Sequence, residues 1–86
     1  MRHAGIDSLD QLDELLLRLR ALPGLREPRR GVFYRRSRAF LHFHEDKTGL
    51  FVDIRFAEDW ERLRVTTAEE RCVLLALIEN RLELAR

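Results

Sequence analysis

Leucines repeat at helical spacing near the start of the chain. From Ser8 onward they recur every three or four positions and form one apolar stripe. Asp7 or Ser8 can cap a helix there, and Pro23-Gly24 can stop it. The pattern therefore predicts an amphipathic helix from Ser8 to Leu22. The stripe consists of Leu9, Leu12, Leu15, Leu16, Leu19 and Leu22.

A second helix is expected towards the C-terminus. The segment 67–70 has the form of a capping box, in which Thr67 accepts a hydrogen bond from the Glu70 amide and Glu70 reaches back. The apolar residues that follow repeat at helical spacing and predict a helix that packs on a sheet. Cys72 opens this apolar run, so we expect it to be a buried structural thiol. The predicted apolar stripe consists of Val73, Leu74, Leu77, Ile78 and Leu82.

The middle of the chain, residues 32–67, is rich in aromatic and β-branched residues, which are typical of strands. Polar interruptions at 36–37, 46–49 and 57–59 divide it into four short strands, whereas 25–31 is read as a loop. The predicted fold class is α+β. We expect a two-layer sandwich in which N- and C-terminal helices pack on one face of a four-stranded antiparallel meander, as a single domain spanning 1–86.

The alternation of side chains along strands predicts which residues share a face of the sheet. If 46–49 forms a turn, three pairs lie on the face away from the helices. These pairs are His44 with Phe51, His42 with Asp53, and Phe40 with Arg55.

The same alignment can be extended to the neighbouring strands. It puts Arg64 beside Asp53 and Arg62 beside Arg55. With Arg36-Ser37 as a two-residue turn, Phe33 joins the face away from the helices, next to Phe40. Val32 and Tyr34 then join the core face.

Length and composition narrow the class of protein. The chain has 86 residues, of which 45% are hydrophobic and 36% charged, as in a globular domain. A chain this short buries only about 60% of its unfolded surface, so a dimer would add stability. The net charge of +1 argues against a wholly basic nucleic-acid-binding chain. The single cysteine excludes an internal disulfide and a Cys-rich zinc module.

The expected compartment follows from the apolar runs. The first residues lack the apolar core of a signal peptide, and the longest apolar run, Cys72–Ile78, is far shorter than a membrane span. We therefore expect a cytoplasmic protein with no membrane partner.

The His42-Phe43-His44 segment is a candidate metal site. Two histidines two positions apart on a strand project from one face, with Asp53 as a third ligand. Imidazoles and a carboxylate suit Zn²⁺ or another divalent ion, and no other cofactor is predicted. The alternative is structural: His42 pairs with Asp53 across the strands, and His44 packs against Phe51.

An arginine-rich stretch from Arg26 to Arg38 is a candidate nucleic-acid site. Arginines beside Phe33 and Tyr34 could grip phosphates or stack on unpaired bases. The alternative is that these charged turns are simply solvated. The candidate residues are Arg29, Arg30, Arg35, Arg36 and Arg38, with Arg26 preceding them.

A small anionic ligand is a third candidate partner. Arginines on the face away from the helices could hold a carboxylate or phosphate between aromatic walls. The same aromatic face could instead be buried in a homodimer. The candidate ligand-binding residues are His42, Asp53, Arg55, Arg62, Arg64, Phe40 and Phe51. Catalysis is not predicted, because no nucleophile is matched to His42 and Asp53.

Three segments carry a resemblance to known proteins. Phe40–Asp46, Gly49–Arg55 and Trp60–Thr67, which read FLHFHED, GLFVDIR and WERLRVTT, together resemble a group of small uncharacterised bacterial proteins with the same plan of helix, strands and helix. His42 and His44 followed by Val-Asp-Ile are also similar to the core of the domain named after fungal luciferase.

A further resemblance concerns the fold. Leu22-Pro23-Gly24 before an aromatic hairpin is similar to the MmcQ/YjbR family. Its frataxin-like fold implies both helices on one face of an antiparallel sheet, and its DNA binding would favour the arginine-rich stretch.

Taken together, the sequence predicts a small binding or interaction module that acts through the sheet face away from the helices, as a homodimer. Two alternatives stay open. One is a divalent-metal or small-anion site at His42, His44 and Asp53, with Arg64 as the anion partner. The other is nucleic-acid binding through the arginine-rich stretch.

Overall fold

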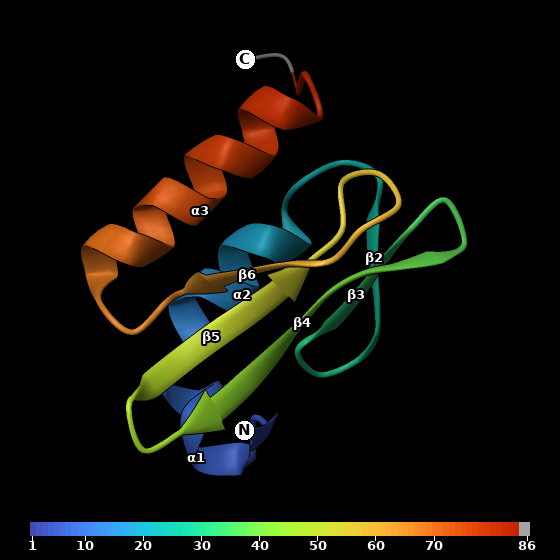
Figure 1. The fold of residues 1–86 in the computed structure, drawn as a ribbon. Helices are drawn as coiled ribbons and strands as arrows, with labels where there is room; N and C mark the ends of the chain where they lie inside the picture. The colour runs from blue at the N-terminus through green and yellow to red at the C-terminus, as the bar shows by residue number, and fades with distance from the viewer. Residues whose placement is uncertain (85–86) are drawn as a thin grey trace.

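A computed structural model of the protein describes residues 1–84 (Figure 1). Five strands form an antiparallel meander in the order β2-β3-β4-β5-β6, and a short sixth strand, β1, pairs with β4. The elements are β1 (Arg2–His3), α1 (Ile6–Gln11), α2 (Asp13–Arg20), β2 (Leu25–Arg29), β3 (Val32–Arg35), β4 (Arg38–Asp46), β5 (Gly49–Ile54), β6 (Glu61–Arg64) and α3 (Ala68–Arg81).

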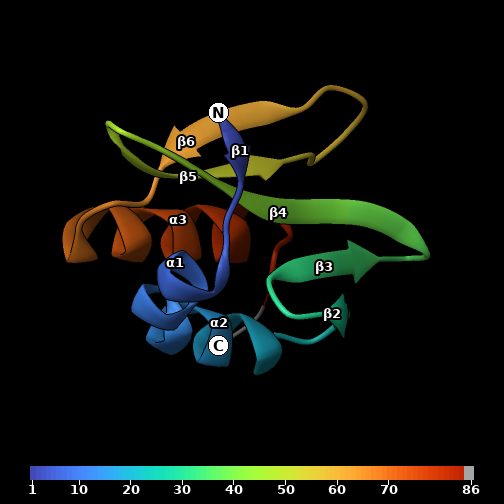
Figure 2. The same ribbon diagram turned by 90° about the horizontal axis from the view of Figure 1, so that it is seen from below.

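All three helices lie on the same side of β4, β5 and β6 (Figure 2). The core between these layers is apolar, as the predicted α+β class requires. Its fully buried side chains are Leu12, Leu16, Leu19, Phe33, Leu41, Val52, Ile54, Val65, Leu74 and Ile78. Among residues 1–84, no helix is long and apolar enough to cross a membrane.

The sheet is larger than the predicted four strands. The segment expected to be a loop contains β2, which pairs with β3 at one edge of the sheet. The alignment shifts between Arg26 and Arg29, so Pro28 lies where the pairing is irregular. Proline lacks an N–H and is tolerated at such an edge. The predicted loop was wrong because a proline does not exclude an edge strand.

The N-terminal helix is divided in two. It begins at Ile6 instead of Ser8, and it breaks at Leu12, whose backbone has φ −91° and ψ 7°. Neither Asp7 nor Ser8 caps it: Gly5 precedes the first turn, and the Ser8 hydroxyl donates to Glu45 instead. The predicted apolar stripe is otherwise confirmed, because Leu12, Leu15, Leu16 and Leu19 are buried.

Helix α3 begins with the predicted capping box. The Glu70 amide donates to Thr67 Oγ1 at 3.1 Å, and the Thr67 amide donates to Glu70 Oε1 at 3.0 Å. These bonds satisfy backbone donors at the helix start, which normally lack partners.

The apolar face of α3 is narrower than predicted. Leu74 and Ile78 are fully buried, but Val73 is 65% exposed and Cys72 is also exposed. Both expectations of burial were wrong. The helix presents the side that carries Leu74 and Ile78 to the sheet. Cys72 and Val73, which precede Leu74, lie on the exposed side.

The alignment of β4 with β5 is the predicted one. His42 faces Asp53, and His44 faces Phe51. The Arg55 amide donates to the Phe40 carbonyl, which continues the same alignment. The turn at 46–49 thus places both histidines and Asp53 on one face.

The alignment of β5 with β6 differs from the prediction by two residues. Asp53 faces Arg62 instead of Arg64, and Arg64 faces Phe51. The connection between the strands, residues 55–60, is longer than the tight turn that the predicted alignment requires. A shift of two residues keeps every side chain on its predicted face but changes its partner.

The alignment of β3 with β4 contains a bulge. The two-residue turn at Arg36-Ser37 is confirmed, because Arg35 faces Arg38. Beyond it the register shifts, and Phe33 faces Leu41 instead of Phe40. A bulge adds one residue to one strand and turns the following side chains to the other face.

This bulge overturns the predicted aromatic surface. Phe33 and Phe40 are 0% and 3% exposed and belong to the core. Phe40 packs edge-on against Phe56, with ring centroids 5.7 Å apart. Of the three phenylalanines expected on the outer face of the sheet, only Phe51 lies there.

Candidate functional site

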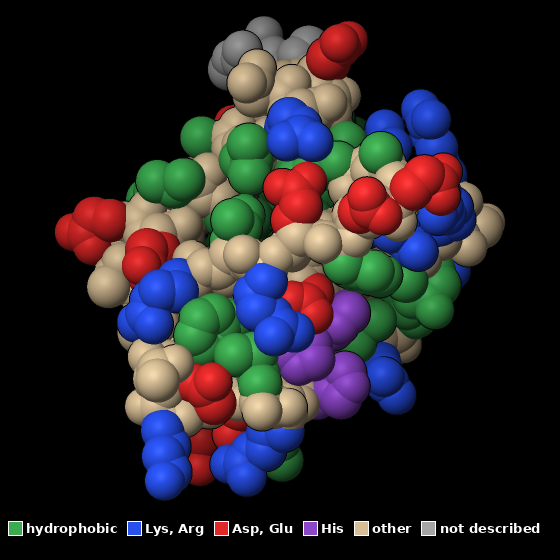
Figure 3. All heavy atoms as spheres, in the orientation of Figure 1, with side chains coloured by type: hydrophobic (Ala, Val, Ile, Leu, Met, Phe, Trp, Pro, Cys, Tyr) green, Lys and Arg blue, Asp and Glu red, His purple; other side chains and the backbone are tan. Residues whose placement is uncertain are grey.

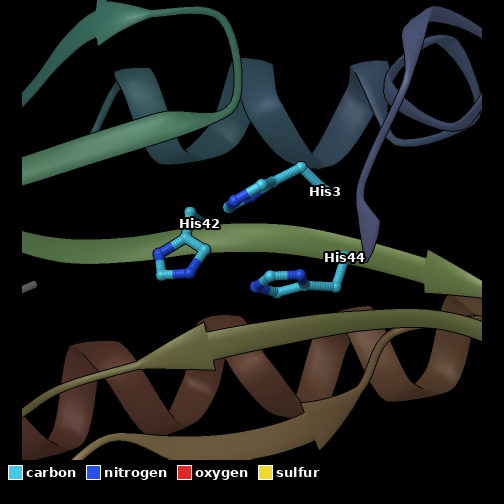
Figure 4. Close-up of side chains that lie close together, drawn as sticks. All are labelled: His3, His42 and His44. Atoms are coloured by element: carbon cyan, nitrogen blue, oxygen red, sulfur yellow. The ribbon is translucent and has the colours of Figure 1, made fainter. Parts of the chain in front are cut away.

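All three histidines of the chain gather on the outer face of the sheet (Figures 3 and 4). We call His3, His42 and His44 the histidine cluster. One potential ligand atom from each ring lies within 4.8 Å of the others. The rings of His3 and His44 are stacked with centroids 4.7 Å apart, and the His42 ring meets the His44 ring edge-on at 4.8 Å.

Strand pairing explains this convergence. His42 and His44 are two residues apart on β4, so their side chains project from the same face. β1 pairs with β4 so that His3 faces His44. The Ala4 amide donates to the Phe43 carbonyl at 3.0 Å and continues this pairing.

Glu45 attaches the N-terminal segment to β4. Its carboxylate accepts hydrogen bonds from the Gly5 amide at 2.8 Å, the Ser8 hydroxyl at 2.7 Å and Arg2 Nε at 2.9 Å. The bond from the Gly5 amide, followed by those from Ser8 and Arg2, lowers the pKa of Glu45 to about 2. Glu45 is thereby held as a carboxylate, and this attachment positions His3.

Asp53 lies beside the cluster on β5 and is held by an arginine. Its Oδ2 atom is 3.2 Å from His44 Nε2 and 3.7 Å from His42 Nε2. Arg62 Nε donates to Oδ1 at 2.7 Å, and Arg62 Nη2 donates to Oδ2 at 2.8 Å. The hydrogen bonds from Arg62 lower the pKa of Asp53, although burial acts in the opposite direction.

His44 is the most enclosed member of the cluster. Its side chain is 12% exposed, against 24% for His42. Both ring nitrogens of His44 are buried and have no hydrogen-bond partner, because the contact with Asp53 is close but not aligned as a hydrogen bond. Unpartnered buried nitrogens are uncommon in folded proteins and call for an explanation.

His42 is held in its neutral form. Burial, with a smaller contribution from the neighbouring His44, lowers its pKa, although Asp53 acts in the opposite direction. The Trp60 ring meets the His42 ring edge-on at 5.0 Å. A neutral imidazole has a free lone pair, which is the form that binds metal ions.

A cavity of about 260 Å³ adjoins the cluster. His3 and His42 belong to its lining, together with the apolar Val32 and Phe43 and the cationic Arg29 and Arg30. The cluster therefore has room beside it for water or a small ligand.

The predicted anion site is not brought together. Arg62 is occupied by Asp53, and the Arg64 guanidinium lies 5.4 Å from the Phe51 ring centre and near Glu70. The Arg55 guanidinium donates to the Ala39 carbonyl at 2.8 and 3.2 Å. Phe40 is buried in the core. The expected partnership of Arg64 with Asp53 was wrong because of the two-residue shift of β6.

The arginine-rich stretch separates into two groups at opposite ends of β3. At one end Arg30 lies 2.9 Å from Asp10 and 3.3 Å from Asp13, while Arg29 has no ion pair among the described residues. At the other end lie Arg35, Arg36 and Arg38. Arg26 stacks over Tyr34. The stretch does not form one continuous basic surface.

Sequence reasoning missed His3. Nothing in the first residues is typical of a strand, and β1 is only two residues long. The available signal was the histidine count: the chain has three, and two were already placed on one face.

Comparison with protein-family models, curated proteins and solved structures gave no match to this chain. The resemblances drawn from the sequence therefore stay predictions.

Proposed function

We propose that the protein binds one divalent metal ion of the zinc type through His3, His42 and His44. The observation that supports this is the convergence of every histidine in the chain, from two separate strands, on one point of the sheet. Neutral imidazoles are suitable ligands for Zn²⁺, Cu²⁺ and Ni²⁺ and poor ligands for Mg²⁺ and Ca²⁺.

The rings must move slightly to hold an ion. Nitrogens bound to tetrahedral Zn²⁺ at about 2.0–2.1 Å lie about 3.3 Å apart. The ring atoms here are separated by up to 4.8 Å, so side-chain rotations would have to draw them together. His44 would gain the most, because a coordinate bond would satisfy one of its buried nitrogens.

Asp53 takes a supporting role in this proposal, in place of the ligand role expected from the sequence. Ligating histidines commonly direct their second ring nitrogen at a carboxylate, which sets the ring's tautomer and orientation. Asp53 lies 3.2 Å from His44 Nε2, so His44 Nδ1 is the atom left for the metal. Arg62 stays paired with Asp53, and this ion pair limits the repulsion between the Arg62 guanidinium and the metal ion.

Three histidines leave one tetrahedral position open. Metal sites of this kind hold water or a ligand in that position. The cavity beside His3 and His42 has space for either.

Calorimetric titration of the metal-free protein with Zn²⁺ at pH 7.5 tests the proposal. We expect one site per chain. His44→Gln should weaken binding by more than about 100-fold, because loss of a mere supporting residue already costs about 10–100-fold. Arg64→Gln is the matched control: this residue lies on the same face but outside the cluster, and its loss should leave the affinity unchanged. Absence of binding heat, or equal affinity in His44→Gln, would rule the proposal out.

The homodimer and the interaction surface expected from the sequence stay predictions. They relied on an apolar outer face, and two of its three phenylalanines lie in the core instead. The metal proposal therefore has the stronger support.

A further inference from the structure

A second concentration of charge lies at the other end of β4, away from the histidine cluster. Arg35, Arg36, Arg38 and Arg55 line one cleft of about 190 Å³ between the β3–β4 turn and the β5–β6 connection. We call these four residues the arginine cleft. The acidic residue in its lining is Glu58.

The β3–β4 turn, which carries Arg36, departs from the usual residue preferences. Arg36 and Ser37 have φ values of 54° and 65°. Two-residue turns with this left-handed backbone favour Asn-Gly, because other side chains are strained there. Neither residue has the side chain that the backbone prefers.

The arginines beside the turn also repel each other. Arg35 and Arg38 face each other across the two strands. Like charges in directly opposite positions destabilise a sheet. Local features that reduce stability without a structural gain are characteristic of functional sites.

The arginines are poorly neutralised by their neighbours. Glu58 approaches Arg38 at 3.7 Å but is itself 87% exposed, so water screens this pair. Among the described residues, Arg35 and Arg36 have no ion pair. The cleft therefore keeps a net positive charge.

One arginine of the cleft is held in place. The Arg55 guanidinium donates to the Ala39 carbonyl and lies over the Trp60 ring, 4.6 Å from its centre. Ala39 adjoins the bulge in β4. Phe40 and Phe56 supply an apolar part of the lining. A guanidinium held in this way loses less conformational freedom when an anion binds.

We propose that the arginine cleft binds a phosphate group. Guanidinium groups form paired, charge-assisted hydrogen bonds with phosphate oxygens, and a dianion would remove the repulsion between Arg35 and Arg38. The cleft is smaller than the roughly 300–1,000 Å³ of pockets that enclose drug-sized ligands. It therefore accommodates the phosphate group itself, whether on a small phosphomonoester or on a nucleic-acid backbone.

The test is an NMR titration of the intact protein with inorganic phosphate, at low salt and with a chelator present to keep metal away. We expect saturable shifts of the backbone amides at 35–39 and 57–58. The double substitution Arg36→Asn/Ser37→Gly suits the turn backbone, so the hairpin should still form. It removes one guanidinium and should weaken phosphate binding by about tenfold, as for loss of one charged hydrogen bond. Arg29→Gln, at the opposite end of β3, is the matched control and should bind phosphate normally.

Two further ligands identify the source of the phosphate. If phenyl phosphate saturates the same amides and a short single-stranded oligonucleotide does not compete, the ligand is a small phosphomonoester. If the oligonucleotide displaces phosphate with a strong salt dependence, the cleft contacts a nucleic-acid backbone. The proposal is overturned if phosphate causes no saturable shift at the turn, or if Arg29→Gln weakens binding as much as the turn variant does.

Discussion

The two hairpins that share β4 are built differently. Between β4 and β5 the pairing runs without interruption from Leu41–Ile54 to Asp46–Gly49. The turn is stabilised by Asp46, whose carboxylate accepts hydrogen bonds from the Thr48 amide and hydroxyl at 2.7 and 2.6 Å. Between β3 and β4 the turn has two residues with left-handed backbone, and a bulge follows it.

Each hairpin positions one of the proposed sites. The regular hairpin carries His42, His44 and Asp53, whose shared face depends only on strand alternation. The irregular hairpin carries three of the four arginines of the arginine cleft; its bulge turns Phe40 into the core, and its strained turn holds Arg36. The regular hairpin thus places side chains by alternation alone, whereas the irregular hairpin combines a left-handed turn, opposed arginines and a bulge.

The largest expected effect concerns the bulge. Phe33→Ala should destabilise the protein by about 3–5 kcal/mol, because the bulge buries this ring completely. Without the bulge Phe33 would lie on the outer face and its loss would cost little. Urea denaturation measures the difference, with Phe51→Ala on the half-buried outer face as the matched control. Equal losses for the two variants would contradict the observed register.

The next effect concerns the regular hairpin. Asp53→Asn should weaken Zn²⁺ binding by about 10–100-fold, because the carboxylate 3.2 Å from His44 Nε2, which would orient this ring in the metal-bound site, is lost. Asp7→Asn, an exposed residue on α1, serves as control and should bind like the wild type. Calorimetric titration provides both affinities. Unchanged affinity in Asp53→Asn would mean that Asp53 does not support the metal ligands.

A smaller effect is expected at the strained turn. Arg36→Asn/Ser37→Gly should raise the free energy of unfolding by about 1 kcal/mol, because Asn and Gly tolerate left-handed backbone. Lys47→Asn in the β4–β5 turn is the matched control. Lys47 is not left-handed there, so stability should hardly change. Thermal denaturation compares the stabilities of the two variants. Destabilisation by the double substitution would contradict the inferred strain at Arg36 and Ser37.

The last prediction concerns Glu45, whose contribution to stability is present at neutral pH and disappears in acid. Its pKa falls from an ordinary value near 4.5 to about 2 on folding, so its contribution to stability is complete above pH 4.5. That contribution is lost as the pH falls from 4.5 towards 2. Melting temperatures across this range should fall more steeply for the wild type than for Glu45→Gln. Parallel curves would show that Glu45 does not hold the N-terminal segment.

The parts of the site and fold that could be predicted are those that depend on strand alternation, turn position and helical spacing. Alternation along β4 and the Asp46–Gly49 turn were sufficient to place His42 opposite Asp53 and His44 opposite Phe51. The capping box at Thr67 and the leucine stripe of the first helix were equally readable, because each depends on spacing alone.

The remainder depends on long-range packing. The bulge near Phe40 and the two-residue shift that pairs Asp53 with Arg62 both result from how the strands pack against the core. No local residue pattern marks either of them. His3 joins the cluster through the bonds of Glu45 to Gly5 and Ser8, which join segments far apart in the sequence.

The nitrogen NMR spectrum of the imidazole rings during a Zn²⁺ titration tests the histidine cluster most directly. We predict that the ring signals of His3, His42 and His44 all shift together and stop changing at one equivalent of Zn²⁺. Signals that shift for one or two rings only, or that keep moving beyond one equivalent, would contradict a shared metal site.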